Sequence, residues 1–346
     1  MSMPKISVFS VVLLFFYIFI FLERIIMLKR FLLLLLALLL AVPSALASSL
    51  ETPAPAPVHV APEPTEIPPL IVDATKDTSA ASSLRFKTDA KFFHVWIPNI
   101  RNADAAILCF GDQVYMIDTG DKRAGMKTAE LLNQLGITKV DKLFISHPHH
   151  DHLEGLEYTA KAAKIQEILF CFPHDVNERI IDAITYANKN DIFVSDYKDG
   201  DVFTMGDNEV TLKFWFLDDP DLDMNNNSAV TQVQFGSRRM LFTADMEKEG
   251  QAVLVQRVPA EELRTDILKY PHHGRNALTA EFLEAVNPAA AVITNVNVDW
   301  FGVKYLKHNK IPYYFSCFKR TVLHLWTDGN IWVIEQPPIS KVTPMK

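Results

Sequence analysis

The sequence predicts an α/β protein in which mixed sheets carry helices on their outer faces. From about residue 84 onward, short apolar segments rich in β-branched and aromatic residues alternate with longer segments of helical periodicity. No repeat of fixed period is visible, and the length of region 84–337 suits a single domain. Sheets covered by helices are the natural packing solution for this order of elements.

Each expected element is bounded by turn residues or by a change of periodicity. In the first half, the expected strands are 92–97, 105–110, 113–117, 142–145, 167–172 and 192–194, and the expected helices are 126–135, the segment after His152, and 177–188. A hairpin-like block over 201–204 and 209–216 follows. In the second half, the expected strands are 229–235, 239–243, 266–269, 290–294, 321–327 and 331–335, and the expected helices follow Asp245 and cover 279–286.

The first 47 residues contain two apolar runs, 6–22 and 31–42. The second run follows Lys29 and Arg30 and is followed by small residues up to Ala47. This pattern predicts that residues 27–47 are a secretory signal, which would begin at Met27. The competing interpretation makes run 6–22 a membrane anchor, since it is just long enough to cross a bilayer. The sequence thus predicts a secreted or envelope-associated bacterial protein, or alternatively a membrane-anchored one.

The segment that follows is unlike a folded domain. Residues 48–83 are rich in proline and alanine. This composition cannot form a hydrophobic core and predicts an extended linker. The expected organisation is therefore an N-terminal signal region over 1–47, this linker, one domain over 84–337 and a short tail over 338–346.

Charge and cysteine content narrow the function classes. The chain has a formal charge of −7, and its first 47 residues carry four basic and one acidic side chain, so the remainder would carry −10. Such an acidic domain argues against tight nucleic-acid binding, which depends on Lys and Arg. The cysteines Cys109, Cys171 and Cys317 form no C-x-x-C pair, which argues against a cysteine metal site. Buried free thiols are expected, and the alternative, one disulfide outside the cell, cannot be assigned to a pair.

The segment His147-Pro-His-His-Asp-His152 carries the strongest chemical signal. It follows an apolar strand-like segment, and extended backbone sends residues i and i+2 to the same side, so His147 and His149 can converge on one metal ion. Asp151 and His152 stand where a helix begins and can reach a second ion beside the first. Pro148 stiffens the loop that carries these ligands.

Other acidic and histidine residues stand at the ends of expected strands. Asp118 follows strand 113–117, Asp245 follows strand 239–243, and His272 follows strand 266–269. Strand-end loops on a rigid sheet are where scaffolds present catalytic groups.

These motifs together resemble the metallo-β-lactamase superfamily and, within it, the hydrolase domains of the ComEC competence-protein type. The matching segments are 102–108, Ile117-Asp-Thr-Gly120, Ser146–His152, Asn226-Asn-Ser228, Phe242-Thr-Ala-Asp245 and Leu268-Lys-Tyr-Pro-His-His-Gly274. The resemblance implies an αββα sandwich with a site for two divalent metal ions, zinc or manganese, at one edge.

The resemblance also implies a role for each matching residue. His147 and His149 would bind the first ion, Asp151, His152 and His272 the second, and Asp245 both. Asp118 would orient a ligand histidine. His273 is an alternative to His272 as the ligand. Asp151, Asp245 and Asp118 are the expected catalytic residues.

The chain departs from the family pattern at two places. Many members have another histidine ligand before the bridging aspartate, whereas this chain has Asn225-Asn-Asn-Ser228 near that position, which makes manganese as plausible as zinc. ComEC-type sequences typically read His-His-Gly-Ser, and here Arg275 replaces the serine. Its guanidinium would either hold an anionic oxygen or face solvent. His273, Arg275, Asn227 and Ser228 are therefore weaker candidates for substrate binding.

The leading functional prediction is a secreted metal-dependent hydrolase, specifically a phosphodiesterase or nuclease. Two ions would activate water and neutralise charge on a phosphodiester, and the candidate substrates are DNA and a cell-envelope polymer. The alternatives are a lactone or β-lactam hydrolase of the same fold, which rests on the fold alone, and an inactive envelope-associated binding module. No stable protein partner is predicted, and the N-terminal segment offers a membrane contact.

Overall fold

A computed structural model describes residues 71–75, 91–296 and 301–345 of the chain. Contacts divide the chain into Met1–Thr65 and Glu66–Lys346, and all described residues belong to the second unit. The predicted signal region and most of the linker therefore lie outside the described residues. No helix within the described ranges is both long and apolar enough to cross a membrane.

The larger sheet has nine strands. Their order is β1 (Ile71–Asp73), β18 (Trp332–Glu335), β17 (Leu323–Thr327), β2 (Phe93–Ile97), β3 (Ala105–Phe110), β4 (Gln113–Thr119), β6 (Lys142–Ile145), β8 (Glu167–Phe170) and β9 (Phe193–Asp196). The strands from β18 to β4 pair antiparallel, whereas β4, β6, β8 and β9 pair parallel.

The second sheet has seven strands and faces the first. Their order is β10 (Val202–Met205), β11 (Val210–Trp215), β12 (Val230–Phe235), β13 (Arg238–Phe242), β14 (Ile267–Lys269), β15 (Ala290–Ile293) and β16 (Tyr313–Phe315). It too changes from antiparallel to parallel pairing, at β13. A small parallel pair, β5 (Lys139–Val140) and β7 (Lys164–Ile165), stands apart.

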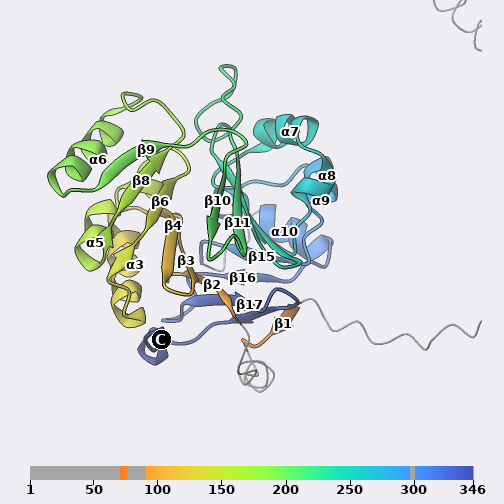
Figure 1. The fold of residues 1–346 in the computed structure, drawn as a ribbon. Helices are drawn as coiled ribbons and strands as arrows, with labels where there is room; N and C mark the ends of the chain where they lie inside the picture. Colours follow the sequence, from red (N-terminus) through yellow and green to blue (C-terminus); the bar gives the residue numbers. More distant parts are fainter. Residues whose placement is uncertain (1–70, 76–90, 297–300, 346) are drawn as a thin grey trace, which may run out of the picture. The chain divides into compact units, whose positions relative to one another are not determined.

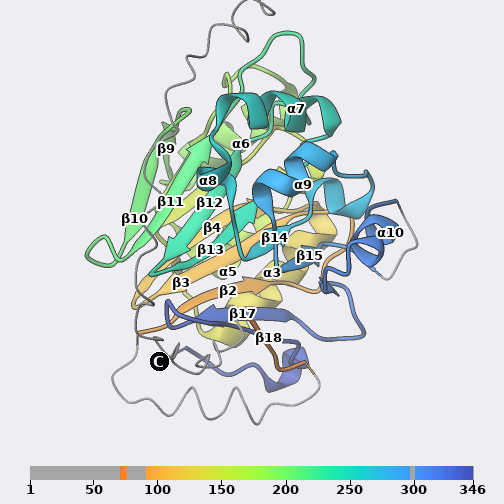
Figure 2. The same ribbon diagram turned by 90° about the vertical axis from the view of Figure 1, so that its right-hand side faces the viewer.

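Helices cover the outer face of each sheet, as Figures 1 and 2 show. The nine-stranded sheet carries α3 (Lys122–Leu135), α5 (Leu156–Ala162) and α6 (Glu178–Lys189), and the seven-stranded sheet carries α7 (Lys248–Arg257), α8 (Ala260–Leu263), α9 (Ala280–Val286) and α10 (Phe301–His308). Three short helices complete the described elements: α4 (His150–Leu153) and the 3-10 turns η1 (Pro271–Gly274) and η2 (Ile339–Lys341).

Three apolar clusters fill the spaces between these layers. One joins both sheets, with Phe144 and Phe214 in contact at 4.7 Å between ring centroids. A second packs α3, α5 and α6 on the nine-stranded sheet, and a third packs α7, α9 and α10 on the other sheet. The structure is thus the αββα sandwich that the family resemblance implies.

Local sequence explains where the helices begin and end. Asp121 caps α3 by accepting a hydrogen bond from the backbone N–H of Ala124, and Gly136 ends the helix in the left-handed conformation at φ 70°. The buried face of α3 includes Leu131, Leu132 and Leu135, which fixes its orientation on the sheet.

The structure differs from the sequence-based expectations at both ends of the domain. Ile71–Asp73, expected in the linker, forms β1 and pairs with β18, because its backbone completes an otherwise open sheet edge. The expected tail over 338–346 is also docked: η2 forms there, Val342 is buried, and Met345 packs on the second cluster. The domain therefore extends beyond 84–337 in both directions.

Candidate metal centre

Four strand ends from the two sheets meet at one edge of the sandwich. Asp118 lies at the end of β4, His147 follows β6, Asp245 follows β13, and η1 follows β14. Because β4 and β6 are parallel, as are β13 and β14, their carboxyl ends point the same way. A backbone hydrogen bond from Ala229 N to Ser146 O, 2.9 Å long, ties the two sheets together here.

Asp151, His152, Asp245 and His273 form the tightest cluster, with one ligand atom of each within 4.8 Å of the others. His152 Nε2 lies 3.2 Å from Asp245 Oδ1, and His273 Nε2 lies 3.4 Å from the same oxygen. His273 Nε2 is also 3.4 Å from Asp151 Oδ2. All four residues are buried. This donor set of two imidazoles and two carboxylates suits a divalent transition metal.

His147 and His149 lie beside the other carboxylate oxygen of Asp245. His147 Nε2 is 4.0 Å from Asp245 Oδ2 and 3.1 Å from His149 Nδ1. The structure therefore brings both predicted pairs of the H-x-H-x-D-H motif to Asp245. His150, the remaining histidine of the motif, is turned outward, with 59% of its side chain exposed.

Unpartnered polar atoms provide an independent test of whether a metal fits. Six buried side-chain atoms of the described residues have no hydrogen-bond partner, and four of them belong to this region: His152 Nε2, Asn225 Oδ1, Asp245 Oδ1 and His273 Nε2. Two of these atoms, His152 Nε2 and His273 Nε2, lie 3.2 Å and 3.4 Å from a third, Asp245 Oδ1. Imidazole nitrogens and carboxylate or amide oxygens are atoms that bind metal ions. The residues present fit a divalent ion.

Asp118 holds His152 rather than joining the cluster. Its Oδ2 lies 2.7 Å from His152 Nδ1, and its Oδ1 accepts a hydrogen bond from the backbone N–H of Ser146 at 2.8 Å. The Ser146 hydroxyl adds a bond of 2.7 Å to Oδ2. With its oxygens occupied in this way, Asp118 is placed to orient the His152 ring.

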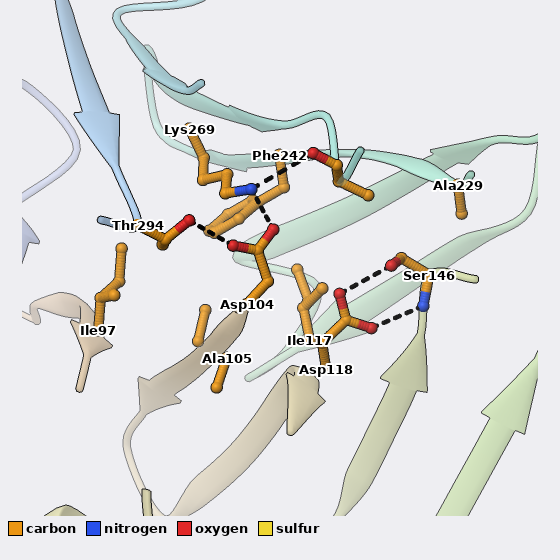
Figure 3. Close-up of a pocket in the computed structure, with 12 residues that line it drawn as sticks. Ile97, Asp104, Ala105, Ile117, Asp118, Ser146, Ala229, Phe242, Lys269 and Thr294 are labelled. Carbon is orange, nitrogen blue, oxygen red and sulfur yellow. Dashed lines mark hydrogen bonds and ion pairs between the residues drawn. The ribbon is translucent and has the colours of Figure 1, made fainter. Parts of the chain in front are cut away.

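Asp104 does the same for His273. Its Oδ1 lies 3.1 Å from His273 Nδ1 and accepts a hydrogen bond from the Thr294 hydroxyl at 2.5 Å, while Oδ2 pairs with the buried ammonium of Lys269. Figure 3 shows the contacts of Asp104 with Lys269 and Thr294 in the small cavity that Asp104 and Asp118 line together. Lys269 also donates to Ala244 O at 3.3 Å, next to Asp245.

The two consecutive histidines of η1 differ in position. His273 is fully buried in the cluster, whereas the His272 side chain is 13% exposed and its Nε2 lies 3.6 Å from Asp245 Oδ2. The structure therefore places the alternative, His273, and not His272, with Asp151 and His152. Arg275 is exposed, and its Nη1 lies 3.4 Å from His272 Nε2, at the open side of the site.

Asn227 and Ser228, in the segment before β12, have structural roles. Asn227 is used within its own loop: its side chain bonds to the backbone of Asp219 and Leu222, so the structure does not bring it to the cluster as predicted. The Ser228 hydroxyl accepts from the backbone N–H of Asp245 at 3.3 Å and is placed to position that residue, not to face a substrate.

In the absence of metal ions, protons on His152 and His273 balance the negative charge of the buried carboxylates. Burial lowers the pKa of His147 well below its usual value. Burial would also lower the pKa of His273, but Asp245 and Asp104 outweigh this and raise it to about 10. Burial would raise the pKa of Asp245, yet His273 and His152 hold it well below its usual range. Metal binding would release the imidazole protons.

The backbone is strained where the site residues attach. Four non-glycine residues at these strand ends have left-handed φ: Asp118 at 59°, Ala244 at 43°, His272 at 47° and His273 at 53°. Such conformations cost about 1–3 kcal/mol each and persist only where the surrounding structure enforces them. Their concentration here marks this edge as a functional site.

The family model described as "Metallo-beta-lactamase superfamily" matches residues 99–293, more than half of the chain. The chain belongs to the metallo-beta-lactamase superfamily. It is a protein of the metal-dependent hydrolase class of this fold. The family expected from the sequence motifs is confirmed.

Two competence proteins are similar to part of the chain. ComE operon protein 3 of Bacillus subtilis (strain 168) is 27% identical over 167 residues, which are 47% of this chain and 21% of that protein. Competence protein ComA of Neisseria gonorrhoeae is 26% identical over 185 residues, 52% of this chain and 24% of that protein. The chain thus spans about a quarter or less of each curated relative.

Among solved structures, a putative metal-dependent hydrolase from Parabacteroides distasonis ATCC 8503 is similar, with 14% identity and a TM-score of 0.43. The match covers 66% of this chain and 94% of that one.

Several residues of the site were not anticipated individually. Asp104 and Lys269 lay inside matching segments but had no predicted role, and Glu247, which lies 2.7 Å from His272 Nδ1, was not singled out. The only signal for Asp104 and Lys269 in the sequence is a charged residue next to an apolar segment: Asp104 precedes β3, and Lys269 ends β14.

Proposed function

We propose that this protein is a metal-dependent phosphodiesterase that uses two divalent ions, zinc or manganese. The proposal rests on the position of Asp245, whose two carboxylate oxygens face different pairs of imidazoles. Oδ1 faces His152 and His273. Oδ2 faces His147 and His272. A carboxylate between two sets of nitrogen donors is the arrangement that two-metal hydrolases require.

Divalent ions, when bound, would supply Lewis acidity that lowers the pKa of a water molecule and neutralises charge on the substrate. The protein's own residues do the rest. Asp118 and Asp104 fix the rings of His152 and His273, so that the donor atoms need no rearrangement. His152 and His273 are fully buried, whereas His149 and His272 are partly exposed, so substrate would approach from the side of His149 and His272.

Arg275 supports an anionic substrate. It is exposed and its guanidinium reaches the open side of the site beside His272. Two planar N–H donors at that place suit the bidentate recognition of a phosphate oxygen pair. Similarity to two competence proteins favours DNA as the substrate, while the negative formal charge of −7 favours a smaller or envelope-bound phosphodiester.

The location is part of the proposal. We infer that residues 27–47 direct export and that the segment up to residue 70 tethers the hydrolase domain outside the cytoplasm or at the envelope, with run 6–22 as an alternative anchor. Sequencing the N-terminus of the mature protein decides between them: a chain beginning at Ser48 supports export, and a retained 6–22 supports the anchor.

One assay separates the proposed activity from its rivals. The full chain, loaded with manganese or zinc, is offered bis-p-nitrophenyl phosphate, single-stranded DNA and a chromogenic cephalosporin. We expect cleavage of at least one phosphodiester and none of the cephalosporin. Cleavage of the cephalosporin alone would establish the β-lactam hydrolase instead, and metal binding without any turnover would favour a binding module.

Paired variants connect the activity to the site. Asp245→Asn should reduce turnover by at least about 10³-fold, since it weakens both groups of ligands. The matched control is Asp182→Asn, on the exposed face of α6, which should retain full turnover.

A further inference from the structure

We infer that the two consecutive histidines of η1 serve different ions. In this assignment, which rests on the proposed two-metal function, His273 completes an inner site with Asp151 and His152. His272 and the side-chain oxygen of Asn225 complete an outer site with His147 and His149. Asp245 belongs to both sites.

The distances to Asp245 separate the two histidines. His273 Nε2 lies 3.4 Å from Asp245 Oδ1, the oxygen that His152 also faces at 3.2 Å. His272 Nε2 lies 3.6 Å from Asp245 Oδ2, the oxygen that His147 faces at 4.0 Å. Each carboxylate oxygen thus has its own pair of imidazoles.

The backbone of η1 produces this division. His272 and His273 both have left-handed φ and ψ, 47° and 47° and 53° and 23° respectively. Their ring centroids are 5.8 Å apart, and the ring planes make an angle of 75°. Two strained residues in succession are costly, and they turn neighbouring imidazoles toward different oxygens of one carboxylate.

A shared feature supports ligation by His272. His152 Nδ1 is held by Asp118 at 2.7 Å, His273 Nδ1 by Asp104 at 3.1 Å, and His272 Nδ1 by Glu247 at 2.7 Å. A carboxylate at one ring nitrogen orients the other ring nitrogen toward a metal. His272 therefore has the same support as the two histidines of the inner site.

Asn225 supplies an oxygen on the outer side. Its side chain interacts with His149 and favours the charged form of that imidazole, and its Oδ1 is buried. The adjacent Asn226 accepts a hydrogen bond from the backbone N–H of Glu247 at 3.1 Å, which ties this loop to the residue that holds His272. The amide oxygen would add an uncharged oxygen donor to the three imidazoles and the Asp245 carboxylate of the outer site.

Arg275 must release His272 for this site to fill. Its Nη1 lies 3.4 Å from His272 Nε2, a long contact made by an exposed side chain. Rotation of the guanidinium into solvent would leave His272 Nε2 facing Asp245 Oδ2, and would place the positive charge where an anionic substrate arrives.

Combined variants test the assignment by counting ions. The full chain is dialysed against manganese(II) and analysed for metal content. The wild type should bind two ions per chain, and His272→Gln and His149→Gln one each. The double variant H149Q/H272Q should still bind one ion, because both changes affect the outer site, whereas H272Q/H273Q should bind none. One ion in H272Q/H273Q, or none in H149Q/H272Q, would overturn the assignment.

Single variants give a second readout if a double variant does not fold, which circular dichroism would show. The wild type should release manganese to a chelator in a fast phase from the outer site and a slow phase from the buried inner site. H272Q should lose the fast phase and H273Q the slow one. Loss of the slow phase in H272Q would refute the assignment.

Asn225 has a matched pair of variants. Asn225→Leu removes the oxygen at similar volume and should weaken binding of the fast-released ion at least about 10-fold, while Asn225→Asp, which keeps the oxygen, should not weaken it. Equal affinity in Asn225→Leu and the wild type would remove Asn225 from the site. If the ion counts follow this pattern but no phosphodiester is cleaved, the proposed function fails and the ligand assignment stands.

Discussion

Asp104 neutralises two buried basic groups, the Lys269 ammonium and the His273 imidazole. Both Asp104 and Lys269 have almost no exposed surface. Burial would raise the pKa of Asp104, but Lys269 and His273 lower it below its usual value, so the carboxylate stays charged. The network gives His273 a fixed ring orientation at the cost of burying charge.

We therefore predict that Lys269→Met lowers the free energy of unfolding by about 3–5 kcal/mol, because it leaves the Asp104 charge without its partner. Chemical denaturation of the metal-free chain measures this. The matched control is Lys213→Met, which breaks a partly exposed pair with Glu262 and should cost less than about 1 kcal/mol. Similar losses in both variants would contradict the role given to the buried pair.

The metal-free protein should be most stable near pH 6.5. The pKa of His273 is raised to about 10 and that of His152 is also raised, so their stabilisation is complete below the unfolded value of about 6.5 and is lost as pH rises toward 10. His147 and His149 have lowered pKa values, so stability also falls below about pH 6.5.

Calorimetry in chelating buffer checks this dependence. The midpoint of thermal unfolding should be higher at pH 6.5 than at pH 9. The metal-loaded protein should lose this decline, because bound ions replace the protons on His152 and His273. An equal or higher midpoint at pH 9 without metal would contradict the charge arrangement.

Individual site residues were predictable only where spacing carried a signal. The motif from His147 to His152 predicts its own convergence, since strand and helix-start geometry fix the side-chain directions. No such rule separates His272 from His273, because their left-handed backbone is set by packing of η1. Asp104 and Lys269 lie far apart in sequence, and only the folded sheets bring them together.

At the scale of elements, the approach of α3 and α5 depends on glycine. A Cβ added at Gly155, just before α5, would lie 2.1 Å from Thr119 O and 2.9 Å from Gly125 Cα. Thr119 follows Asp118, so this contact sets the distance between the end of β4 and the helix that follows the histidine motif. Gly155 is needed for space, since its φ of −75° is open to any residue.

Gly155→Ala should therefore lower the free energy of unfolding by about 3 kcal/mol, the upper range for overpacking, and should weaken metal binding by displacing His152 relative to Asp118. Gly111→Ala separates this effect from backbone strain. Gly111 has φ 59° and open space around it, so that variant should cost about 1 kcal/mol and leave metal affinity unchanged. Unaltered stability and metal affinity in Gly155→Ala would refute the close approach.

Most strands were predictable to within a few residues, because buried strands such as 105–110 and 142–145 are continuous apolar segments. The elements that were missed have weaker patterns. Helix α10 contains Gly302, which lowers helix propensity but lets the helix approach Tyr270 and Gly274. β1 has three residues and forms only because β18 offers an edge.

At the scale of the whole molecule, the layers determine which cysteines are reactive. Cys109 and Cys171 are buried in different apolar clusters, and burial raises the pKa of each thiol to about 12. Cys317 is partly exposed. All three are free thiols in the structure.

Alkylation of the native chain at pH 8 should therefore modify Cys317 alone, since the thiolate is the reactive form. Denaturant should expose all three thiols, which mass spectrometry of the labelled protein would count. Rapid native labelling of Cys109 or Cys171 would show that the clusters are open.

The sandwich brings residues from both sheets, distant in sequence, to the carboxylate of Asp245. The central claim is that Asp245 contributes to the binding of two metal ions. Elemental analysis of the full chain after equilibration with manganese(II) or zinc(II) tests it most directly, with Asp245→Ala beside the wild type and circular dichroism as the check on folding. We predict two ions per chain in the wild type and none firmly held in the folded variant. A wild type that binds no ion, or an Asp245→Ala chain that keeps both, would contradict it.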